Sequence, residues 1–380
     1  MPTPYIRRRD ITEETFRSAV DQAKHEHPNG WRARAAKILG VSPSAIAQRL
    51  ATRPDISAEV FPHPQGHNVA GVSTLYDTDG KIVSQWVKSK AGERTPEQWA
   101  AHVREAFADV APVKPIPRPK AGNDRLLTVY PIGDHHVAMY AWGEEVGADY
   151  DIKISERLLT SAAQHLVHCA PASDTALIVN LGDFLHVDNI KNETSRSGHT
   201  LDVDTRYQAM IHAGVKMLRA VIETALSKHR HVKVVNVIGN HDDVGAQWLA
   251  LTLAMMYEKN PRVTIETKPG KFHYHQHGKV LIGLTHGDTG KPEKIQSVMA
   301  ADVPELWGAT LHRYWMTGHV HTRRVQEFPG VMWETFRTLA PGDAWSRAAA
   351  YRSGRDMTAI VFDTDHGEVA RHRFDVGMLK

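Results

Sequence analysis

The sequence predicts an α/β protein whose larger, C-terminal part alternates strands and helices. Three observations indicate this fold class. From residue 125 onward, short apolar runs alternate with longer stretches that carry apolar residues at helical spacing. Clusters of Asp, His and Asn follow several of the apolar runs. Before residue 125, a run of prolines separates this part from a smaller N-terminal part of different composition.

Bulk composition is typical of a globular protein with more than one domain. The 380 residues contain 42% hydrophobic and 23% charged residues, and the net charge of +3 does not by itself indicate a nucleic-acid partner. The single cysteine, Cys169, excludes an internal disulfide. The N-terminus has no signal-peptide pattern, and the longest apolar stretch, Trp248 to Tyr257, is too short to cross a bilayer. We therefore expect a cytoplasmic protein without a membrane partner.

Residues 1–60 are predicted to form a small helical domain, because apolar residues recur at helical spacing before and after residue 30. Ala36, Gly40 and Ile46 have the spacing of a helix-turn-helix unit. In such a unit a small residue, a glycine turn and an aliphatic residue bring two helices together. Ser42 is expected to cap the third helix.

A helix-turn-helix unit places its last helix in the major groove of DNA, and basic residues nearby contact phosphates. The residues expected to contact DNA are Arg32, Arg34, Ser44, Gln48 and Arg49. The alternative is a protein-interaction or oligomerisation module whose basic residues are only solvated.

Residues 61–111 are predicted to form a β-hairpin followed by a helix. Two β-rich runs flank the turn Asp77-Thr78-Asp79-Gly80, and Thr95-Pro96-Glu97 begins an amphipathic helix. Trp86 is a candidate for DNA contact, although a structural, wing-like role is favoured. Residues 112–124 contain four prolines among basic residues, and we expect them to form a semi-rigid linker.

Residues 125–380 are predicted to form a domain of alternating strands and helices. Helical spacing indicates helices at Ile154–Leu166 and Tyr207–Leu226. Apolar runs that precede polar clusters indicate five strands, at Leu126–Pro131, Ala176–Leu181, Val232–Ile238, Val280–Leu284 and Tyr314–Thr317. Because open α/β sheets bind ligands beyond the carboxyl ends of their strands, we expect the polar clusters to meet at one site.

The clusters offer carboxylate, carboxamide and imidazole groups, which are ligands for divalent metals. They are Asp134-His135-His136, Gly182-Asp183, Gly239-Asn240-His241-Asp242, His286-Gly287 and Gly318-His319-Val320-His321. Two neighbouring cations need one bridging carboxylate and about three further ligands each. We expect Asp183 as the bridge, with Asp134, His136 and His321 on one cation and Asn240, His286 and His319 on the other. His319 and His321 reach two cations only if the chain bends at Val320.

A dinuclear site of this kind indicates phosphoester hydrolysis by a metal-activated hydroxide. His241 lies beside a ligand and is expected to donate a proton to the leaving oxygen, with Asp242 orienting its imidazole. Since the ligand set contains no thiolate, it suits Mn²⁺, Fe or Zn²⁺.

The order D-x-H, G-D, G-N-H-D, H-G and G-H-x-H resembles the calcineurin-like metallophosphoesterase superfamily, over about residues 126–375. The resemblance implies a four-layer α/β/β/α sandwich with the dinuclear site at the sheet edge, the roles given above, and activity with Mn²⁺. In combining these motifs with a helix-turn-helix pattern, the chain is similar to phage-encoded members of the superfamily that are regarded as DNA-repair exonucleases.

The sequence therefore favours a nuclease that hydrolyses DNA phosphodiesters. Two alternatives stay open: a phosphatase or phosphodiesterase for nucleotides or phosphoproteins, and a DNA-binding regulator with a vestigial site. Candidates for substrate contact are His186, Arg196, His199 and Arg323. For His186 a role behind the ligands is equally open, and for Arg323 a solvated strand end. An ATPase partner or a homo-oligomer is also left open, and we expect no capping domain of the kind that related nucleases carry after the core.

Overall fold

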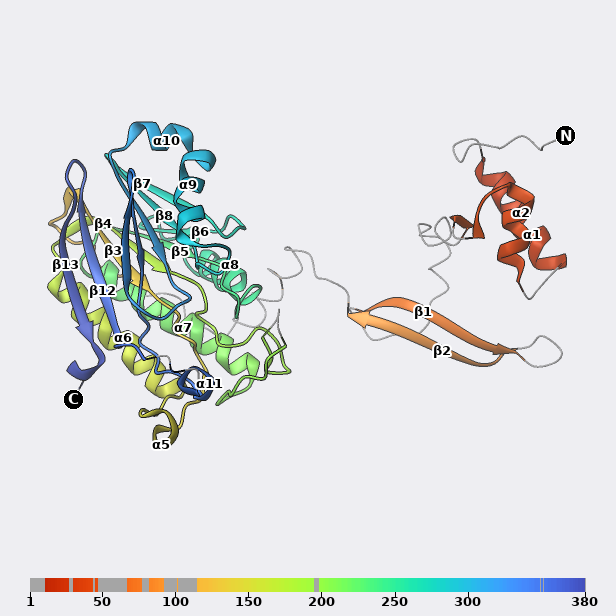
Figure 1. The fold of residues 1–380 in the computed structure, drawn as a ribbon, viewed down its shortest axis with the longest axis horizontal. Helices are drawn as coiled ribbons and strands as arrows, with labels where there is room; N and C mark the ends of the chain where they lie inside the picture. Colours follow the sequence, from red (N-terminus) through yellow and green to blue (C-terminus); the bar gives the residue numbers. More distant parts are fainter. Residues whose placement is uncertain are drawn as a thin grey trace. The chain divides into compact units, whose positions relative to one another are not determined.

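The computed structural model divides the chain into two units, Met1–Thr95 and Pro96–Lys380, whose elements are drawn in Figure 1. It describes residues 11–26, 30–43, 45–46, 67–76, 82–91, 101, 115–194, 198–348, 350 and 352–379. All seven predicted metal ligands belong to the larger unit and to its described residues.

The smaller unit begins with helices α1 (Glu13–Glu26) and α2 (Trp31–Leu39), which pack through a small apolar core. Gly40 ends α2 in the left-handed conformation, with φ 63°, which glycine adopts without strain. Ser42 caps the turn that follows, because its Oγ accepts a hydrogen bond from the amide of Ala45 at 3.2 Å. The glycine turn and the serine cap are therefore confirmed.

The residues predicted to contact DNA are only partly described. Ser44, Gln48 and Arg49 lie outside the described residues. Arg32 is exposed, and its guanidinium carbon lies 5.3 Å from the ring centroid of Trp31. Arg34 pairs with Glu26 at 3.2 Å, and an ion pair this exposed contributes little to stability. The helix-turn-helix unit and its DNA contacts therefore stay predictions.

Strands β1 (His67–Tyr76) and β2 (Ile82–Ala91) pair antiparallel, as the predicted hairpin requires. Trp86 on β2 is 59% exposed. The amphipathic helix predicted from Thr95 onward lies outside the described residues, except for Ala101.

A six-stranded sheet forms one half of the larger unit, in the order β13-β12-β3-β4-β5-β6. Strands β3 to β6 are parallel neighbours, and β12 and β13 run antiparallel at one edge. The bounds are β3 Asn123–Ile132, β4 Ser173–Asn180, β5 His231–Asn236, β6 Val263–Glu266, β12 Asp356–Asp363 and β13 Gly367–Asp375. The central strands are rich in buried apolar residues because both faces of the sheet are covered.

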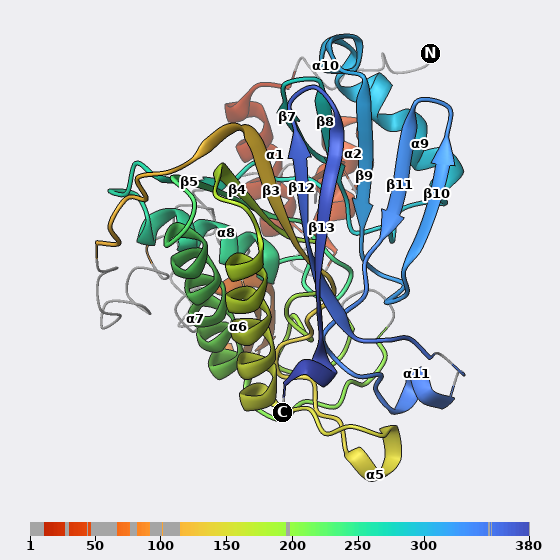
Figure 2. The same cartoon turned by 90° about the vertical axis from the view of Figure 1, so that its left-hand side faces the viewer.

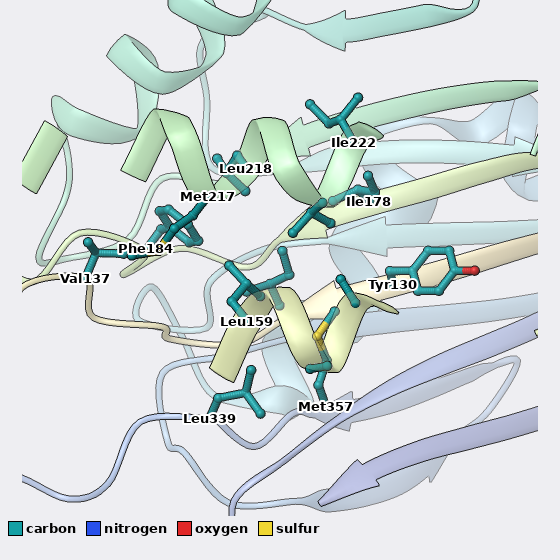
Figure 3. Packing of buried hydrophobic residues seen from close by; sticks show 14 of the residues in the cluster. Tyr130, Val137, Leu159, Ile178, Phe184, Met217, Leu218, Ile222, Leu339 and Met357 are labelled. Carbon is teal, nitrogen blue, oxygen red and sulfur yellow. The ribbon is translucent and has the colours of Figure 1, made fainter. Parts of the chain in front are cut away.

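Three helices cover the outer face of this sheet: α6 (Ile152–Cys169), α7 (Tyr207–Leu226) and α8 (Gly245–Met256). Figure 2 shows α6 and α7 side by side against the strands. Leu159 of α6 and Leu218 of α7 are fully buried in the core between helices and sheet (Figure 3). Burying each such leucine contributes about 1.5–3 kcal/mol, so these helices hold the sheet that carries the site.

A five-stranded sheet, in the order β10-β11-β9-β8-β7, packs against the first one. Its strands are β7 His273–His277, β8 Val280–Leu284, β9 His312–Thr317, β10 Arg324–Phe328 and β11 Val331–Thr335. On its other face, residues of α9 (Pro292–Asp302) and α10 (Pro304–Ala309) pack around the buried Trp315.

The larger unit is therefore layered helix, sheet, sheet, helix, which confirms the predicted four-layer α/β fold. The two sheets meet in a single apolar layer that includes Leu177 of β4 and Ile282 of β8. Short helices α5 (Gly143–Val146), α11 (Ala344–Ala348) and η1 (Val376–Met378) complete the unit. Among the described residues, no helix is long and apolar enough to cross a membrane.

The end of the predicted linker is anchored to the larger unit. Arg262 donates to the carbonyl of Ile116 at 2.7 Å, and Arg230 donates to the carbonyl of Lys120 at 2.6 Å. Strand β3 then begins at Asn123, three residues before the predicted start. Its first residues are exposed, so they carry no apolar signal in the sequence.

Candidate metal centre

The predicted ligands converge where five strands end. Strands β3, β4 and β5 are parallel neighbours in one sheet, and β8 and β9 are parallel neighbours in the other. Each of the five polar clusters begins within a few residues of the end of one of these strands. Parallel strands deliver the segments that follow them to the same edge of a sheet, so residues up to 187 positions apart meet at one place.

Backbone strain is concentrated at these residues. In the described chain, eight residues other than glycine have positive φ, and five of them are predicted ligands. The five are Asp134 (36°), His136 (48°), Asp183 (51°), His319 (69°) and His321 (53°). Positive φ is unfavourable for residues that carry a side chain, and residues that adopt it despite the strain cluster at functional sites. The bend predicted between His319 and His321 is present, with both residues left-handed and the amide of Val320 donating to the carbonyl of Gly318.

The glycines of the clusters make room for the ligand carboxylates. A Cβ added to Gly239 would lie 2.0 Å from Oδ1 of Asp183, and one added to Gly318 would lie 2.5 Å from Oδ2 of Asp134. Both distances are far below van der Waals contact. The glycine next to a ligand in the G-N-H-D and G-H-x-H segments is therefore required by the packing of the site itself.

The first donor group consists of Asp134, His136 and His321. The Nε2 atoms of His136 and His321 lie 3.2 Å apart, and Nε2 of His321 lies 3.4 Å from Oδ1 of Asp134. The Asp134 carboxylate also accepts the amide of His319, at 2.9 and 3.0 Å. Asp134 is buried, and its donor oxygen lies within 4.8 Å of the donor nitrogens of both imidazoles.

The second donor group consists of Asp183, His286 and His319, with Asn240 beside it. Nε2 of His286 lies 3.1 Å from Oδ2 of Asp183 and 3.0 Å from Oδ1 of Asn240. The two groups are neighbours, since Nδ1 of His286 is 4.0 Å from Oδ1 of Asp134. Asp183 is buried, which acts to raise its pKa, but His286, His241 and His136 outweigh this and hold the pKa well below its usual value.

The surroundings of His286 fit a bound cation. Its Nδ1 donates to the carbonyl of Leu181 at 2.8 Å, so in the neutral ring Nε2 carries a lone pair. That lone pair faces two oxygen atoms, of Asp183 and Asn240, so a cation between them would be contacted by all three donors. Burial acts to lower the pKa of His286, but the Asp183 and Asp134 carboxylates raise it to about 10. The same negative charge would attract a divalent cation to this point.

His241 belongs to neither of these two groups, but with His136 and His186 it forms a third cluster, of imidazoles alone, whose donor atoms lie within 4.8 Å of one another. Its amide donates to Oδ1 of Asp183 at 2.8 Å, and its ring centroid lies 5.0 Å from that of His136. Its Nδ1 lies 2.9 Å from the carbonyl oxygen of His186, to which it donates. This leaves Nε2 of His241 as the nitrogen available to a substrate.

Asp242 differs from its predicted role. Its carboxylate accepts four backbone amides, those of Gly239, Asp183, Phe184 and Leu185, at 2.9 to 3.3 Å. Both oxygens are occupied in this way, and the group is fully buried. The partner that orients His241 is therefore the carbonyl of His186, whereas Asp242 ties the loop after β5 to the loop after β4.

The predicted substrate contacts are not all at the site. His186 is buried, and its Nδ1 lies 3.2 Å from Nδ1 of His136. Arg323 donates to Oε1 of Glu334 at 2.9 Å, beside Arg371. His199 is exposed on the loop after β4, and Arg196 of that loop lies outside the described residues. For these last three, substrate contact stays a prediction.

One charged pair near the centre was not predicted from the sequence. Asp288 follows the His286-Gly287 cluster, and its carboxylate pairs with Lys271 at 2.5 Å. The pKa of its neighbour His319 is lowered from the ordinary value. Burial and His286 lower this pKa, and they outweigh the nearby carboxylates, Asp288 included, which raise it. In the sequence, Asp288 could have been found only as the residue that follows the His286-Gly287 cluster, whereas Lys271 lies in a segment without a motif.

Comparison with known proteins gives matches only among solved structures. No model of a protein family and no curated protein matches the chain. An archaeal phosphodiesterase is 12% identical over 66% of this chain and 99% of its own, with a TM-score of 0.32. An uncharacterized protein of Streptococcus pneumoniae TIGR4, described as a predicted phosphoesterase, is 9% identical over 66% and 98%, with a TM-score of 0.27.

Vps29 of Entamoeba histolytica in complex with Zn²⁺ is similar to the chain at 14% identity over 65% of this chain and 98% of its own, with a TM-score of 0.26. TM-scores and identities this low carry no information about activity. The function therefore has to be argued from the geometry of the site.

Proposed function

We propose that the larger unit is a metal-dependent phosphoesterase of the calcineurin-like type, with two divalent cations. One observation carries the proposal: of the three donor groups in the described part of the chain, the two that combine carboxylates and imidazoles lie side by side, each with its donor atoms within 4.8 Å of one another. Neighbouring sites of this kind bind two cations that act on one phosphate. Asp183 is the proposed bridge, and Asn240 the fourth ligand of the second group.

The chemistry of the donors supports Mn²⁺, Fe or Zn²⁺ as the cations. The ligands are carboxylate oxygens, one carboxamide oxygen and imidazole nitrogens, with no thiolate. Imidazoles suit Zn²⁺ and Fe, while carboxylates and carboxamides also accept Mn²⁺. We propose Mn²⁺ as the activating ion and expect Zn²⁺ to bind as well.

Bound cations of this kind supply Lewis-acid activation of water and of the phosphate. The chain itself supplies orientation and protons. The Nδ1–H of His241 donates to the His186 carbonyl, and this fixes the ring so that Nε2 is directed away from that carbonyl. A protonated Nε2 donates to the leaving oxygen as the phosphorus–oxygen bond breaks. The buried carboxylates of Asp134 and Asp183 would hold the cations in place.

DNA is the proposed substrate, and the smaller unit is proposed to deliver it. The glycine turn at Gly40, the capped turn at Ser42 and the exposed Arg32 support a nucleic-acid-binding unit. The protein is proposed to act in the cytoplasm, where its exposed thiol, Cys169, would stay reduced.

The activity is tested with bis-p-nitrophenyl phosphate, thymidine p-nitrophenyl phosphate, p-nitrophenyl phosphate and linear DNA, each with Mn²⁺ added to metal-free protein. We expect diester hydrolysis that falls at least about 100-fold in Asp183→Asn, as when a group that stabilises the transition state is removed. Asp202→Asn makes the same change at an exposed position and should keep full activity. Hydrolysis of the monoester alone would favour a phosphatase, and no hydrolysis with any metal would contradict the proposal.

A further inference from the structure

His186 joins the first donor group to the catalytic histidine. It lies three residues after Asp183, and only 2% of its surface is exposed. Its Nδ1 lies 3.2 Å from Nδ1 of His136, and its carbonyl accepts Nδ1 of His241 at 2.9 Å. The His186 ring also stacks on the His241 ring, with centroids 5.6 Å apart and planes 19° apart.

The backbone fixes the relative position of His186 and His136. The amide of His136 donates to the carbonyl of Asp183 at 3.0 Å, and the amide of His186 donates to the carbonyl of Val137 at 3.1 Å. Between them, the amide of Val137 donates to the carbonyl of Phe184 at 2.7 Å. These three hydrogen bonds form a short parallel ladder, so the contact between the imidazoles does not depend on a flexible loop.

A ligand imidazole needs its lone pair on the nitrogen that faces the cation. In His136 that nitrogen is Nε2, which lies 3.2 Å from Nε2 of His321 in the first donor group. The proton of the neutral ring must then sit on Nδ1, and there it needs an acceptor, because His136 is only 4% exposed. The acceptor within reach is Nδ1 of His186.

We propose that His186 is a positioning residue: its Nδ1 accepts the Nδ1–H of His136 and so keeps the His136 Nε2 lone pair directed at the first cation. The inference rests on the proposed metal centre. A hydrogen-bond partner at the ring nitrogen that does not face the metal orients a metal-ligating histidine, and loss of such a partner weakens metal affinity about 10–100-fold. The proposal gives His186 two separate roles. Its side chain orients His136, and its carbonyl holds His241 whatever side chain the residue carries.

Burial argues against direct substrate contact by His186. Both neighbouring imidazoles, of His136 and His241, pack on its ring, with centroids 5.1 and 5.6 Å away. A ring enclosed in this way contributes to catalysis by holding its neighbours, and its effect should appear first in metal binding.

The test compares three variants by the affinity for Mn²⁺, measured by isothermal titration calorimetry on metal-free protein. In His186→Asn the side-chain carboxamide can place its oxygen near the position of Nδ1, whereas in His186→Gln it reaches the position of Nε2, and His186→Ala has no acceptor. We expect one of two sites to lose affinity about 10–100-fold in the Ala and Gln variants, and the Asn variant to stay within a few-fold of the native chain. Equal affinity in all variants would overturn the inference, as would equal loss in Asn and Gln.

A measurement on the native chain avoids any folding defect in the variants. Long-range ¹H–¹⁵N spectra of histidine-labelled, Zn²⁺-loaded protein report which nitrogen of each imidazole is protonated. We expect His136 protonated at Nδ1 and His186 at Nε2. The opposite tautomer of His136 would overturn the inference. His168→Ala removes an exposed imidazole and should leave both affinities unchanged.

The outcomes separate this inference from the proposed function. If the native chain binds no cation, the metal centre and the inference both fail. If it binds two cations but hydrolyses no phosphoester, the proposed function fails while the variants still decide the role of His186. If it binds and hydrolyses normally and His186→Ala binds as tightly as the native chain, the inference alone fails.

Discussion

Nε2 of His136 and Nε2 of His321 lie 3.2 Å apart, although the two residues are separated by 185 positions in the chain. Two ligand atoms that are each about 2.1 Å from one cation lie roughly 3.0–3.4 Å apart at bond angles of 90–109°. The observed distance therefore matches two ligands of a single metal ion. Asp134 belongs to the same donor group, with its Oδ1 3.4 Å from Nε2 of His321, and its carboxylate supplies the charge that a cation needs.

Gly239 should be intolerant of any side chain. A Cβ there would lie 2.0 Å from Oδ1 and 2.3 Å from the amide nitrogen of Asp183. In Gly239→Ala, the Asp183 carboxylate must move, so we expect loss of tight Mn²⁺ binding and a lower melting temperature. Gly308→Ala is the matched control, because a Cβ at Gly308 in α10 meets nothing within 4 Å. Thermal unfolding with and without Mn²⁺ measures both; equal behaviour of the two variants would contradict the packing argument.

Asp242 should behave as a structural residue and not as part of a catalytic pair. Its carboxylate accepts four buried amides, and each buried donor left unsatisfied costs about 1–3 kcal/mol. We expect Asp242→Asn to lower the free energy of unfolding by several kcal/mol and to impair metal binding and hydrolysis together. Chemical denaturation measures the stability of this variant, and enzyme kinetics measure its hydrolysis. A variant of native stability that lost only kcat would return Asp242 to the role of orienting His241.

His241 should be needed for turnover and dispensable for metal binding. It belongs to neither of the two groups that contain carboxylates, and its Nδ1 is held by the His186 carbonyl. In His241→Asn the carboxamide can keep that hydrogen bond but has no ring nitrogen to donate. We expect kcat to fall about 10²–10⁴-fold, with the stoichiometry of bound Mn²⁺ unchanged. Loss of a cation in this variant would mean that His241 is a ligand, and unchanged kcat would exclude it as the acid.

Buried His229 should make the metal-free protein less stable in acid. Its Nδ1 donates to the carbonyl of Ser173, and Tyr130 donates to its Nε2, so the neutral ring is satisfied. Burial lowers the pKa of His229 to about 4, against about 6.5 in the unfolded chain. Between these values the unfolded state binds more protons, so stability is lost as pH falls from 6.5 towards 4.

The contribution of His229 in that window is about 1.4 kcal/mol per pH unit. The free energy of unfolding is measured in urea at several pH values for the native chain and for His229→Asn. The difference between the two isolates the contribution of His229, because the other buried histidines titrate in both proteins. We expect a smaller slope of stability against pH in the variant, whatever its absolute stability. Identical slopes would show that His229 is not buried in its neutral form.

The central strands, and the meeting of the polar clusters at one edge, could be predicted because each of these strands is apolar and a polar cluster follows it directly. Strands β7 and β10 could not, since HYHQH and RVQEF are mostly polar and β10 is largely exposed. Their pairing depends on neighbours that are distant in sequence, and no periodicity records that.

The partners of the site residues were also beyond the sequence. The role of Asp242 depends on amides 57 to 59 positions earlier, and that of His186 on an imidazole 50 positions away. The motifs bring their residues to one place, but which neighbour each side chain contacts depends on hydrogen bonds between loops. For that reason the convergence of the clusters was easier to predict than the hydrogen-bond partners of their residues.

The central claim is a pair of adjacent cation sites, and calorimetric titration of Mn²⁺ into metal-free protein tests it most directly. We expect two cations per chain in the native protein. In His321→Ala we expect one, because this change removes a donor of the first group and leaves Asp183, His286 and His319 in place. Two tight sites in both proteins, or none in the native chain, would contradict the account.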